Sequence, residues 1–343
     1  TNMLVSTYMK DLMKKTKPSH AYEAIKRNHA PGGMMSYESA DDLKFYVKKG
    51  YCPGNAGKTL EWAFQDWGLS RMALRMGKKS DAALYEKRSR AWTPLFNENI
   101  GLILPKKENG EWLHTDPLNG QGWVEANAWQ ATWSVSHDLP KLVELMGGGD
   151  AFCEKLNYAF EQARPTDFVH AYSGGYVSYA NQPGCSNAHL FTYGGQPWLT
   201  QYWVRQVKEH AYGGITPDKG YGGHDEDEGQ MGAVSALMSL GLFSVTGTEY
   251  DSPYYDITSP IFDKITIKLN KDYYSGDEFV INVHNNSADN CYIQKAELNG
   301  TDWIYAQLDH VDFAKGGTLN LWLGNMPNKS WGKLKYLGFK TNK

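Results

Sequence analysis

The spacing of apolar residues changes once along this chain, and that change restricts the fold more than any other feature. Up to about residue 246, apolar side chains recur every three or four residues, which is typical of helices that bury one face. Glycine pairs separate these stretches, and no strands alternate with them. After Val245 the spacing becomes two, which is typical of strands with one buried face. The sequence therefore predicts a helical region, 1–246, followed by an antiparallel β domain, 247–343.

Individual elements follow from the same patterns. The helical spacing predicts helices over Leu4–Lys15, Ala21–His29, Thr59–Met76, Ser80–Phe96, Asn127–Met146, Ala151–Arg164, Pro197–Tyr212 and Gln230–Phe243. The last of these is apolar nearly all round, so we expect it to be buried on every side. The period of two predicts strands over Asp263–Leu269, Glu278–Asn282, Cys291–Leu298 and Gly317–Leu323. The expected class is mainly α, with a small β-sandwich at the C-terminal end.

Charge and cysteine content exclude several classes of protein. The chain has 35 Lys and Arg against 38 Asp and Glu, a net charge of −3, which argues against a nucleic-acid binder. Its longest apolar stretch, Met231–Val245, is interrupted by serine and glycine and is too short to cross a bilayer. The four cysteines contain no CxxC pair, which argues against a zinc ribbon. We expect them to be buried as small apolar residues.

Aromatic residues are abundant, with 12 Trp, 22 Tyr and 12 Phe in 343 residues. Aromatic rings stack on the apolar faces of sugars and of nucleobases. Because the chain has no positive excess, the sugar interpretation is favoured. The alternative is that these rings fill a large helical core.

One tryptophan-rich stretch, GWVEANAWQATW at 122–133, contains a single carboxylate, Glu125. If the stretch is helical, Glu125, Trp129 and Trp133 share one face. Burial against indoles disfavours the charged form of a carboxyl and raises its pKa. A carboxyl that stays protonated near neutral pH can serve as a glycosidase general acid. The alternative is a glutamate at a helix N-terminus that interacts only with the helix dipole.

Four consecutive carboxylates, Asp225–Glu228, follow a glycine-rich loop in GYGGHDEDEGQ. Crowded like charges are costly unless a cation, a hydrogen-bond donor or a polarised water compensates them. The run indicates a catalytic base combined with a metal, and the alternative is a solvated acidic helix start. Asn181 and Gln182 precede Pro183 on a predicted loop, where oxygen atoms could bind Ca²⁺ or cap the next helix. His137 and Asp138 are either substrate contacts or a capping pair ahead of Leu139.

Several long motifs in this order resemble glycoside hydrolase family 92. They are GWVEANAWQATWSVSHDLPKLVELMGG, YANQP, LFTYGGQPWLTQ, GGHDEDEGQMGA, ALMSLGLFSVTG and KGGTLNLWLGNMPNKSWG, which together extend the resemblance from about Ala21 to Gly332. Members of the family are calcium-dependent, exo-acting α-mannosidases, mostly bacterial, that invert the anomeric configuration. The resemblance implies an (α/α)6 toroid flanked by β domains, with the active site completed partly by an N-terminal β-sandwich.

The resemblance also implies roles for individual residues. Glu125 matches the general acid, and Asp225 and Asp227 match the acidic pair that activates the attacking water. Asn181 and Gln182 match an amide and acid pair near the calcium, although the family usually has glutamate where this chain has Gln182. We further assign Trp129, His137 and Asp138 as candidate substrate contacts. The expected substrate is a mannose-containing oligosaccharide or N-glycan, with α-1,2 linkages favoured.

The same resemblance implies a secreted, periplasmic or cell-surface location. We expect the chain to be the C-terminal part of a longer protein, because fewer helices are predicted than the twelve of a complete toroid and the N-terminal β-sandwich has no counterpart. The main alternative is a carbohydrate-binding or structural fragment with little activity alone. A toroidal polysaccharide lyase is disfavoured, because Asp225–Glu228 would repel its anionic substrate.

Overall fold

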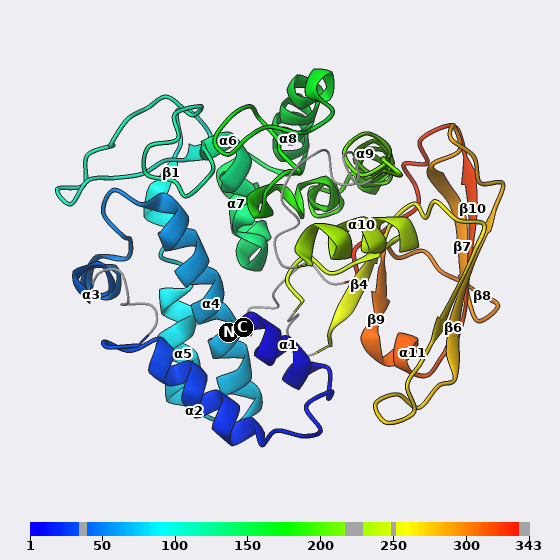
Figure 1. Cartoon of the computed structure of the whole chain (residues 1–343), viewed down its shortest axis with the longest axis horizontal. Helices are drawn as coiled ribbons and strands as arrows, with labels where there is room; N and C mark the ends of the chain where they lie inside the picture. Colours follow the sequence, from blue (N-terminus) through cyan, green and yellow to red (C-terminus); the bar gives the residue numbers. More distant parts are fainter. Residues whose placement is uncertain (34–39, 217–228, 248–251, 336–343) are drawn as a thin grey trace.

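Helices occupy the first two thirds of the chain and strands the remainder (Figure 1). The computed structural model describes residues 1–33, 40–216, 229–247 and 252–335. Its helices are α1 (Asn2–Met9), α2 (Pro18–Asn28), α3 (Ala40–Lys49), α4 (Ala56–Arg75), α5 (Lys79–Arg88), α6 (Ala128–Ala131), α7 (Leu139–Leu145), α8 (Gly149–Ala163), α9 (Pro197–His210), α10 (Gln230–Leu240) and α11 (His310–Ala314). No helix within these residues is both long and apolar enough to cross a membrane.

Short strands accompany the helices, and longer ones form the C-terminal part. They are β1 (Phe96–Asn97), β2 (Leu102–Ile103), β3 (Leu242–Phe243), β4 (Tyr254–Ile257), β5 (Lys264–Lys268), β6 (Glu278–His284), β7 (Tyr292–Leu298), β8 (Thr301–Asp302), β9 (Gln307–Asp309) and β10 (Gly317–Gly324). The four predicted strands correspond to β5, β6, β7 and β10. The predicted helices Thr59–Met76 and Ala151–Arg164 correspond to α4 and α8, whereas α3 was not predicted.

The long helix α4 organises the N-terminal part of the chain. Asn55 caps its first turn, because its side chain accepts a hydrogen bond from the Lys58 amide at 2.8 Å. Just beyond its end, Gly77 adopts a φ of +75°, which lets the chain turn away at little cost. The helix packs against α1, α2 and α5, and these contacts enclose one apolar cluster. Its other residues reach the main helical core and the cleft described below.

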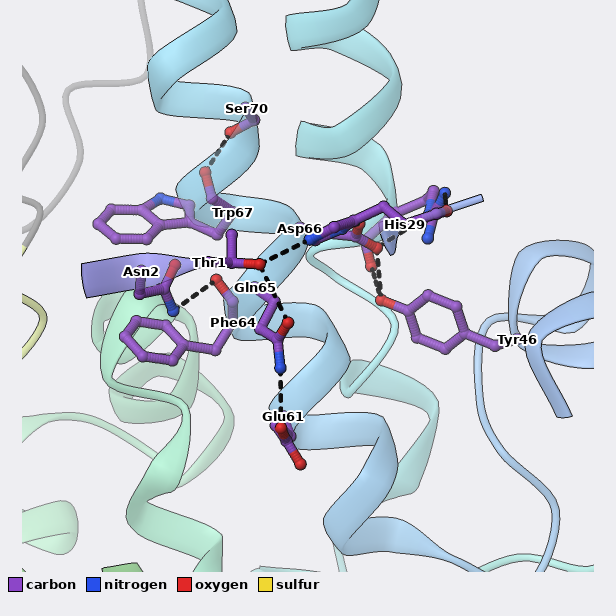
Figure 2. Close-up of polar contacts among 11 residues, drawn as sticks. Thr1, Asn2, His29, Tyr46, Glu61, Phe64, Gln65, Asp66, Trp67 and Ser70 are labelled. Atoms are coloured by element: carbon purple, nitrogen blue, oxygen red, sulfur yellow. Dashed lines mark hydrogen bonds and ion pairs between the residues drawn. The ribbon is translucent and has the colours of Figure 1, made fainter. Parts of the chain in front are cut away.

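A buried ion cluster joins α4 to its neighbours around Asp66, which has no solvent exposure. The Asp66 carboxylate accepts hydrogen bonds from His29 Nδ1 at 2.7 Å and Tyr46 OH at 2.9 Å (Figure 2). It also accepts one from Arg88 Nε at 2.8 Å. These donors come from the end of α2, from α3 and from α5. Burial, followed by the Asp66 charge, raises the pKa of Tyr46 well above its usual value. A buried carboxylate is tolerated here because it is both paired and hydrogen-bonded.

The prediction of one continuous helix over Asn127–Met146 is wrong. In the structure this stretch forms α6 and α7, which are joined by short 3₁₀ turns. Asn127 caps α6 by accepting a hydrogen bond from the Gln130 amide, so the helix begins after Glu125. Pro140 lies in the first turn of α7, where its missing N–H is tolerated. A continuous helix would instead place its ring against the carbonyl four residues earlier. The stretch therefore does not present one aligned helix face.

The prediction that Gln230–Phe243 is buried on every side is also wrong. In α10, Met231, Val234 and Met238 are buried, whereas Ala233 and Ala236 are exposed. The outward residues are small, so their contact with water costs little free energy. The helix ends at Gly241, whose φ of +71° allows the chain to continue directly into β3.

The C-terminal strands form two sheets that share one core. The larger has the order β5–β6–β10–β7–β8, and β10 runs parallel to β6, which corrects the prediction of a purely antiparallel domain. The smaller is antiparallel, in the order β3–β4–β9. Ile257 and Leu308 of the smaller sheet join Phe279 and Leu321 of the larger in one buried cluster. The strand β3 places Phe243 beside the helices, on the wall of the cleft.

The four cysteines are free and buried, as predicted. Direct hydrogen bonds also attach the helices to the sheets. Gln201 Oε1 on α9 accepts from the Ile293 amide on β7 at 2.8 Å, and Tyr193 OH donates to the buried Asp256 carboxylate on β4 at 3.0 Å. The helical part and the sheets are thus connected through buried polar contacts as well as through the chain.

Candidate active site

A cleft of about 850 Å³ opens between the start of α4, the loop before α6, the turn at 182–186 and the junction of α10 with β3. Its wall combines aromatic rings with hydroxyl, amide and charged groups, a mixture that suits a polar ligand with apolar faces. The described residues that line it are Gly57, Lys58, Leu60, Glu61, Trp62, Phe64, Trp123, Val124, Ala126, Ala131, Ser134, Ser136, Gln182, Pro183, Cys185, Ser186, Gln230, Val234, Phe243 and Val245.

Glu125 lies in the loop ahead of α6. Its neighbours Val124 and Ala126 line the cleft, whereas Glu125 is not itself among the described lining residues. Its φ is +49°, in the left-handed region that residues other than glycine seldom adopt. Asn181 restrains it from the neighbouring turn: Nδ2 donates to the backbone oxygen and to Oε2 of Glu125, both at 3.1 Å. One amide group therefore holds both the backbone and the carboxyl of Glu125, which limits where the carboxyl can point.

The predicted burial of Glu125 against tryptophans is wrong, because its side chain is exposed. The reason is that the chain is not helical at Glu125, so residues four apart do not stack. Trp123 is buried in the cleft wall, and Trp133 lies completely within the helical core. The carboxyl is open to solvent instead of being enclosed by indoles.

Trp129 belongs to a separate aromatic cluster. Its ring centroid lies 5.6 Å from that of Tyr158 and 5.1 Å from that of Tyr176, and the Lys155 ammonium lies 5.3 Å from the ring centre. Trp129 is not among the described residues that line the cleft. The structure therefore gives no support to its predicted contact with substrate in this cleft.

His137 is a core residue with 1% exposure, which contradicts its predicted contact with substrate. Nε2 donates to the Ser89 backbone oxygen at 2.9 Å, and the ring packs against Phe64 and Trp67. Burial lowers the pKa of His137 to about 4, so the ring is neutral at pH 7. A side chain with almost no accessible surface cannot touch a bound sugar.

Asp138 is mostly buried beside His137, and its Oδ2 accepts a hydrogen bond from Trp92 Nε1 at 3.2 Å. Burial raises the pKa of Asp138 to about 6. It is the N-cap residue of α7, the position that the capping alternative gives it, but its side chain makes no capping hydrogen bond. Asp138 is also absent from the described lining of the cleft. Its observed contact is with the indole of Trp92.

Asn181 and Gln182 begin a 3₁₀ turn at the edge of the cleft. Asn181 is buried, and its Oδ1 accepts from the Gln182 amide at 2.9 Å, so the capping alternative describes this residue. Gln182 is exposed and lines the cleft. Among the described residues, no group of three or more His, Cys, Asp or Glu side chains is placed to hold a metal. These residues alone do not supply the six to eight oxygen ligands that Ca²⁺ takes.

The predicted water-activating pair, Asp225 and Asp227, lies outside the described residues. The described part of the chain resumes at residue 229, just before α10. Gln230 and Val234 of that helix line the cleft. The acidic run is therefore close in sequence to a helix that forms part of the cleft wall.

One group of cleft residues was missed by the sequence analysis. Lys58, Glu61 and Trp62 line the cleft from the first turns of α4. In the sequence they belong to an ordinary amphipathic helix, so nothing distinguishes the exposed Glu61 from a solvated surface glutamate. Its position becomes notable only when the loop before α6 and the turn at 182–186 have folded to line the same cleft.

Known proteins share this architecture. The family model described as the Glycosyl hydrolase family 92 catalytic domain matches residues 1–325. An uncharacterized secreted glycosidase of Arthroderma benhamiae is 26% identical to this chain. The alignment covers 96% of this chain and 45% of the glycosidase. A solved inverting mannosidase of the family from Bacteroides thetaiotaomicron is 31% identical, with a TM-score of 0.83 over 96% of this chain and 46% of that one.

A second structure from Bacteroides thetaiotaomicron, an α-mannosidase of the family in complex with mannoimidazole, has a TM-score of 0.84. At 23% identity it supports the fold alone; it covers 100% of this chain and 46% of that protein. The chain thus spans about half the length of these relatives. Because the family match extends over nearly all of its residues, this chain belongs to glycosyl hydrolase family 92.

Proposed function

We propose that this chain carries the catalytic carboxylates of an exo-acting, inverting α-mannosidase that prefers α-1,2 linkages in mannose-containing glycans. The observation that carries the proposal is the exposed carboxyl of Glu125 beside an aromatic cleft, restrained by Asn181 at both backbone and Oε2. The family relative with 31% identity is described as an inverting mannosidase, which supports the substrate and the stereochemistry. The curated relative is called a secreted glycosidase, which supports export.

The proposed mechanism divides the chemistry between two carboxyl sites. Inversion requires an acid that protonates the leaving oxygen and a carboxylate that activates water on the opposite sugar face, roughly 6.5–9.5 Å away. We assign the acid to Glu125 and the base to Asp225 and Asp227, following the resemblance of their motifs. Asn181 would keep the acid aligned with the glycosidic oxygen. The aromatic wall, including Trp123, would receive an apolar face of the sugar.

The base assignment predicts that Asp225→Asn and Asp227→Asn each lower kcat by on the order of 10²-fold or more. Activated aryl mannosides and mannobioses should lose activity alike, because both need the attacking water. Steady-state kinetics on the two substrate types measures the effect. Asp272→Asn, at an exposed aspartate outside the described cleft lining, is the matched control and should leave kcat unchanged. Full activity in both aspartate variants would contradict the assignment of the catalytic base to this segment.

The resemblance also implies Ca²⁺, with Gln182 and carboxylates outside the described residues as candidate ligands. Since the described residues do not form such a site alone, no catalytic step is derived through the ion. We expect excess EGTA to abolish activity and added Ca²⁺, but not Mg²⁺, to restore it. Far-UV circular dichroism should stay nearly unchanged, because hydrogen bonds between protein groups hold Asn181 and Glu125 together. Full activity in EGTA would contradict the calcium requirement.

The proposed function is tested by incubating the chain with α-1,2-, α-1,3- and α-1,6-linked mannobioses and following the released sugar by NMR. An inverting enzyme acting on an α-linkage releases β-mannose first, before mutarotation. Faster cleavage of the α-1,2 isomer would support the proposed preference. Release of α-mannose would contradict inversion, and binding without hydrolysis would favour the alternative of a carbohydrate-binding unit.

A further inference from the structure

We infer that Glu61 is a second functional carboxylate of the cleft, which binds hydroxyl groups of the mannoside and is held in place from the protein interior. The inference rests on the proposed function. Glu61 lies on α4, lines the cleft and is exposed. Lys58, one turn earlier, directs its ammonium toward Asp42 at 3.0 Å.

The Glu61 carboxylate has one restrained oxygen and one available oxygen. Gln65 Nε2 donates to Oε1 at 2.7 Å, which is the one hydrogen bond that the described residues give this carboxyl. No hydrogen bond to Oε2 is found among the described residues. The Thr1 ammonium lies nearby: burial lowers its pKa, and the Glu61 charge partly opposes that shift. A carboxylate that keeps lone pairs available while one oxygen is anchored can accept hydrogen bonds from neighbouring sugar hydroxyls.

A hydrogen-bond chain connects Glu61 to the buried ion cluster of Asp66 (Figure 2). From Gln65, the next contact is Thr1 Oγ1, 3.2 Å from Gln65 Oε1. Thr1 Oγ1 lies 3.0 Å from His29 Nε2, and His29 Nδ1 lies 2.7 Å from Asp66 Oδ1. Asp66 and His29 are buried, whereas Glu61 is exposed, so the chain runs from the interior to the cleft.

The directions of the two hydrogen bonds made by Gln65 follow from the charge of Glu61. An ionised Glu61 can only accept, so Gln65 must present Nε2 to it and Oε1 to Thr1. Thr1 must then donate its hydroxyl proton to Gln65 Oε1. Gln65 is thus locked in one amide orientation and fixes Glu61.

Trp123 provides an aromatic surface close to Gly57, in the first turn of the same helix as Glu61. Trp123 lines the same cleft, and its buried Nε1 has no hydrogen-bond partner within the described residues. An anchored carboxylate beside an aromatic ring suits a ligand that has both hydroxyl groups and an apolar face, as a sugar does. Gln65 contacts no ligand in this arrangement and is a positioning residue for Glu61.

The test compares wild type with Glu61→Gln, Gln65→Leu and the double variant. Isothermal titration calorimetry with methyl α-D-mannopyranoside gives Kd, and hydrolysis of α-1,2-mannobiose gives kcat and KM. Glu61→Gln should raise Kd and KM by roughly tenfold or more, because a hydrogen-bonded charge is lost. Gln65→Leu should raise them by a smaller factor. The double variant should be no weaker than Glu61→Gln alone, because Gln65 acts through Glu61.

Glu154→Gln, an exposed glutamate on α8 outside the described cleft lining, is the matched control and should bind as wild type does. The thermal midpoints of Glu61→Gln and Glu154→Gln should agree with that of wild type. Wild-type affinity in Glu61→Gln would overturn the inference while leaving the proposed function intact. Fully additive losses in the double variant would overturn the positioning role of Gln65. A wild-type chain that neither binds nor hydrolyses mannosides would overturn the proposed function and this inference together.

Discussion

Glu125→Gln should lower kcat/KM for α-1,2-mannobiose by about 10²- to 10⁴-fold, because the departing sugar then leaves without a proton from a positioned acid. An aryl mannoside with an activated leaving group needs little protonation and should lose far less. Glutamine has the same shape and can still accept the hydrogen bond from Asn181 Nδ2 that Oε2 accepts now. The loss therefore reports on proton transfer more than on altered geometry. Steady-state kinetics with the two substrate types measures the difference.

The matched control for this experiment is Glu108→Gln, an exposed glutamate outside the described cleft lining. It should leave both activities unchanged. Equal losses on mannobiose and on the activated substrate would contradict the acid role of Glu125. They would instead indicate that Glu125 binds substrate or shapes the loop, whose backbone oxygen Asn181 also holds.

Asp66→Ala should lower the free energy of unfolding by about 3–5 kcal/mol, the usual cost of removing one partner from a buried ion pair. The variant removes the carboxylate that accepts hydrogen bonds from His29 Nδ1, Tyr46 OH and Arg88 Nε. Each of these groups would remain largely shielded from water, so solvent cannot fully replace the lost hydrogen bonds. The midpoint of urea unfolding, followed by tryptophan fluorescence and circular dichroism, measures the effect.

Asp81→Ala is the matched control, because it also removes an aspartate that contacts a tyrosine and a cation. Asp81 accepts hydrogen bonds from Tyr22 and Lys26, and these contacts lower its pKa. Its side chain is only partly buried, and that of Lys26 is 40% exposed. Water can replace much of this interaction, so we expect a loss of about 1 kcal/mol or less. Similar losses in the two variants would show that burial of Asp66 contributes little.

The amino-acid pattern alone was sufficient for the coarse organisation of this protein. Helical spacing before residue 246 and alternation after it predicted the order of elements, because periodicity records which side of an element faces the core. α8 and the strands β5, β6, β7 and β10 appear where the pattern places them. The motif resemblance to family 92 was confirmed by the match over residues 1–325. The burial of all four cysteines was also predicted correctly.

The arrangement of the candidate site was decided by tertiary structure. Glu125 is exposed and restrained by Asn181, a residue 56 positions away, whereas the sequence suggested a carboxyl buried among neighbouring tryptophans. His137, a candidate substrate contact in the sequence, lies in the core against Phe64 and Trp67 of α4. Glu61 has no distinguishing sequence pattern, yet it lines the cleft. Periodicity describes one element at a time, whereas the contacts and solvent exposure of a polar side chain depend on elements that are distant in sequence and meet only when the chain is folded.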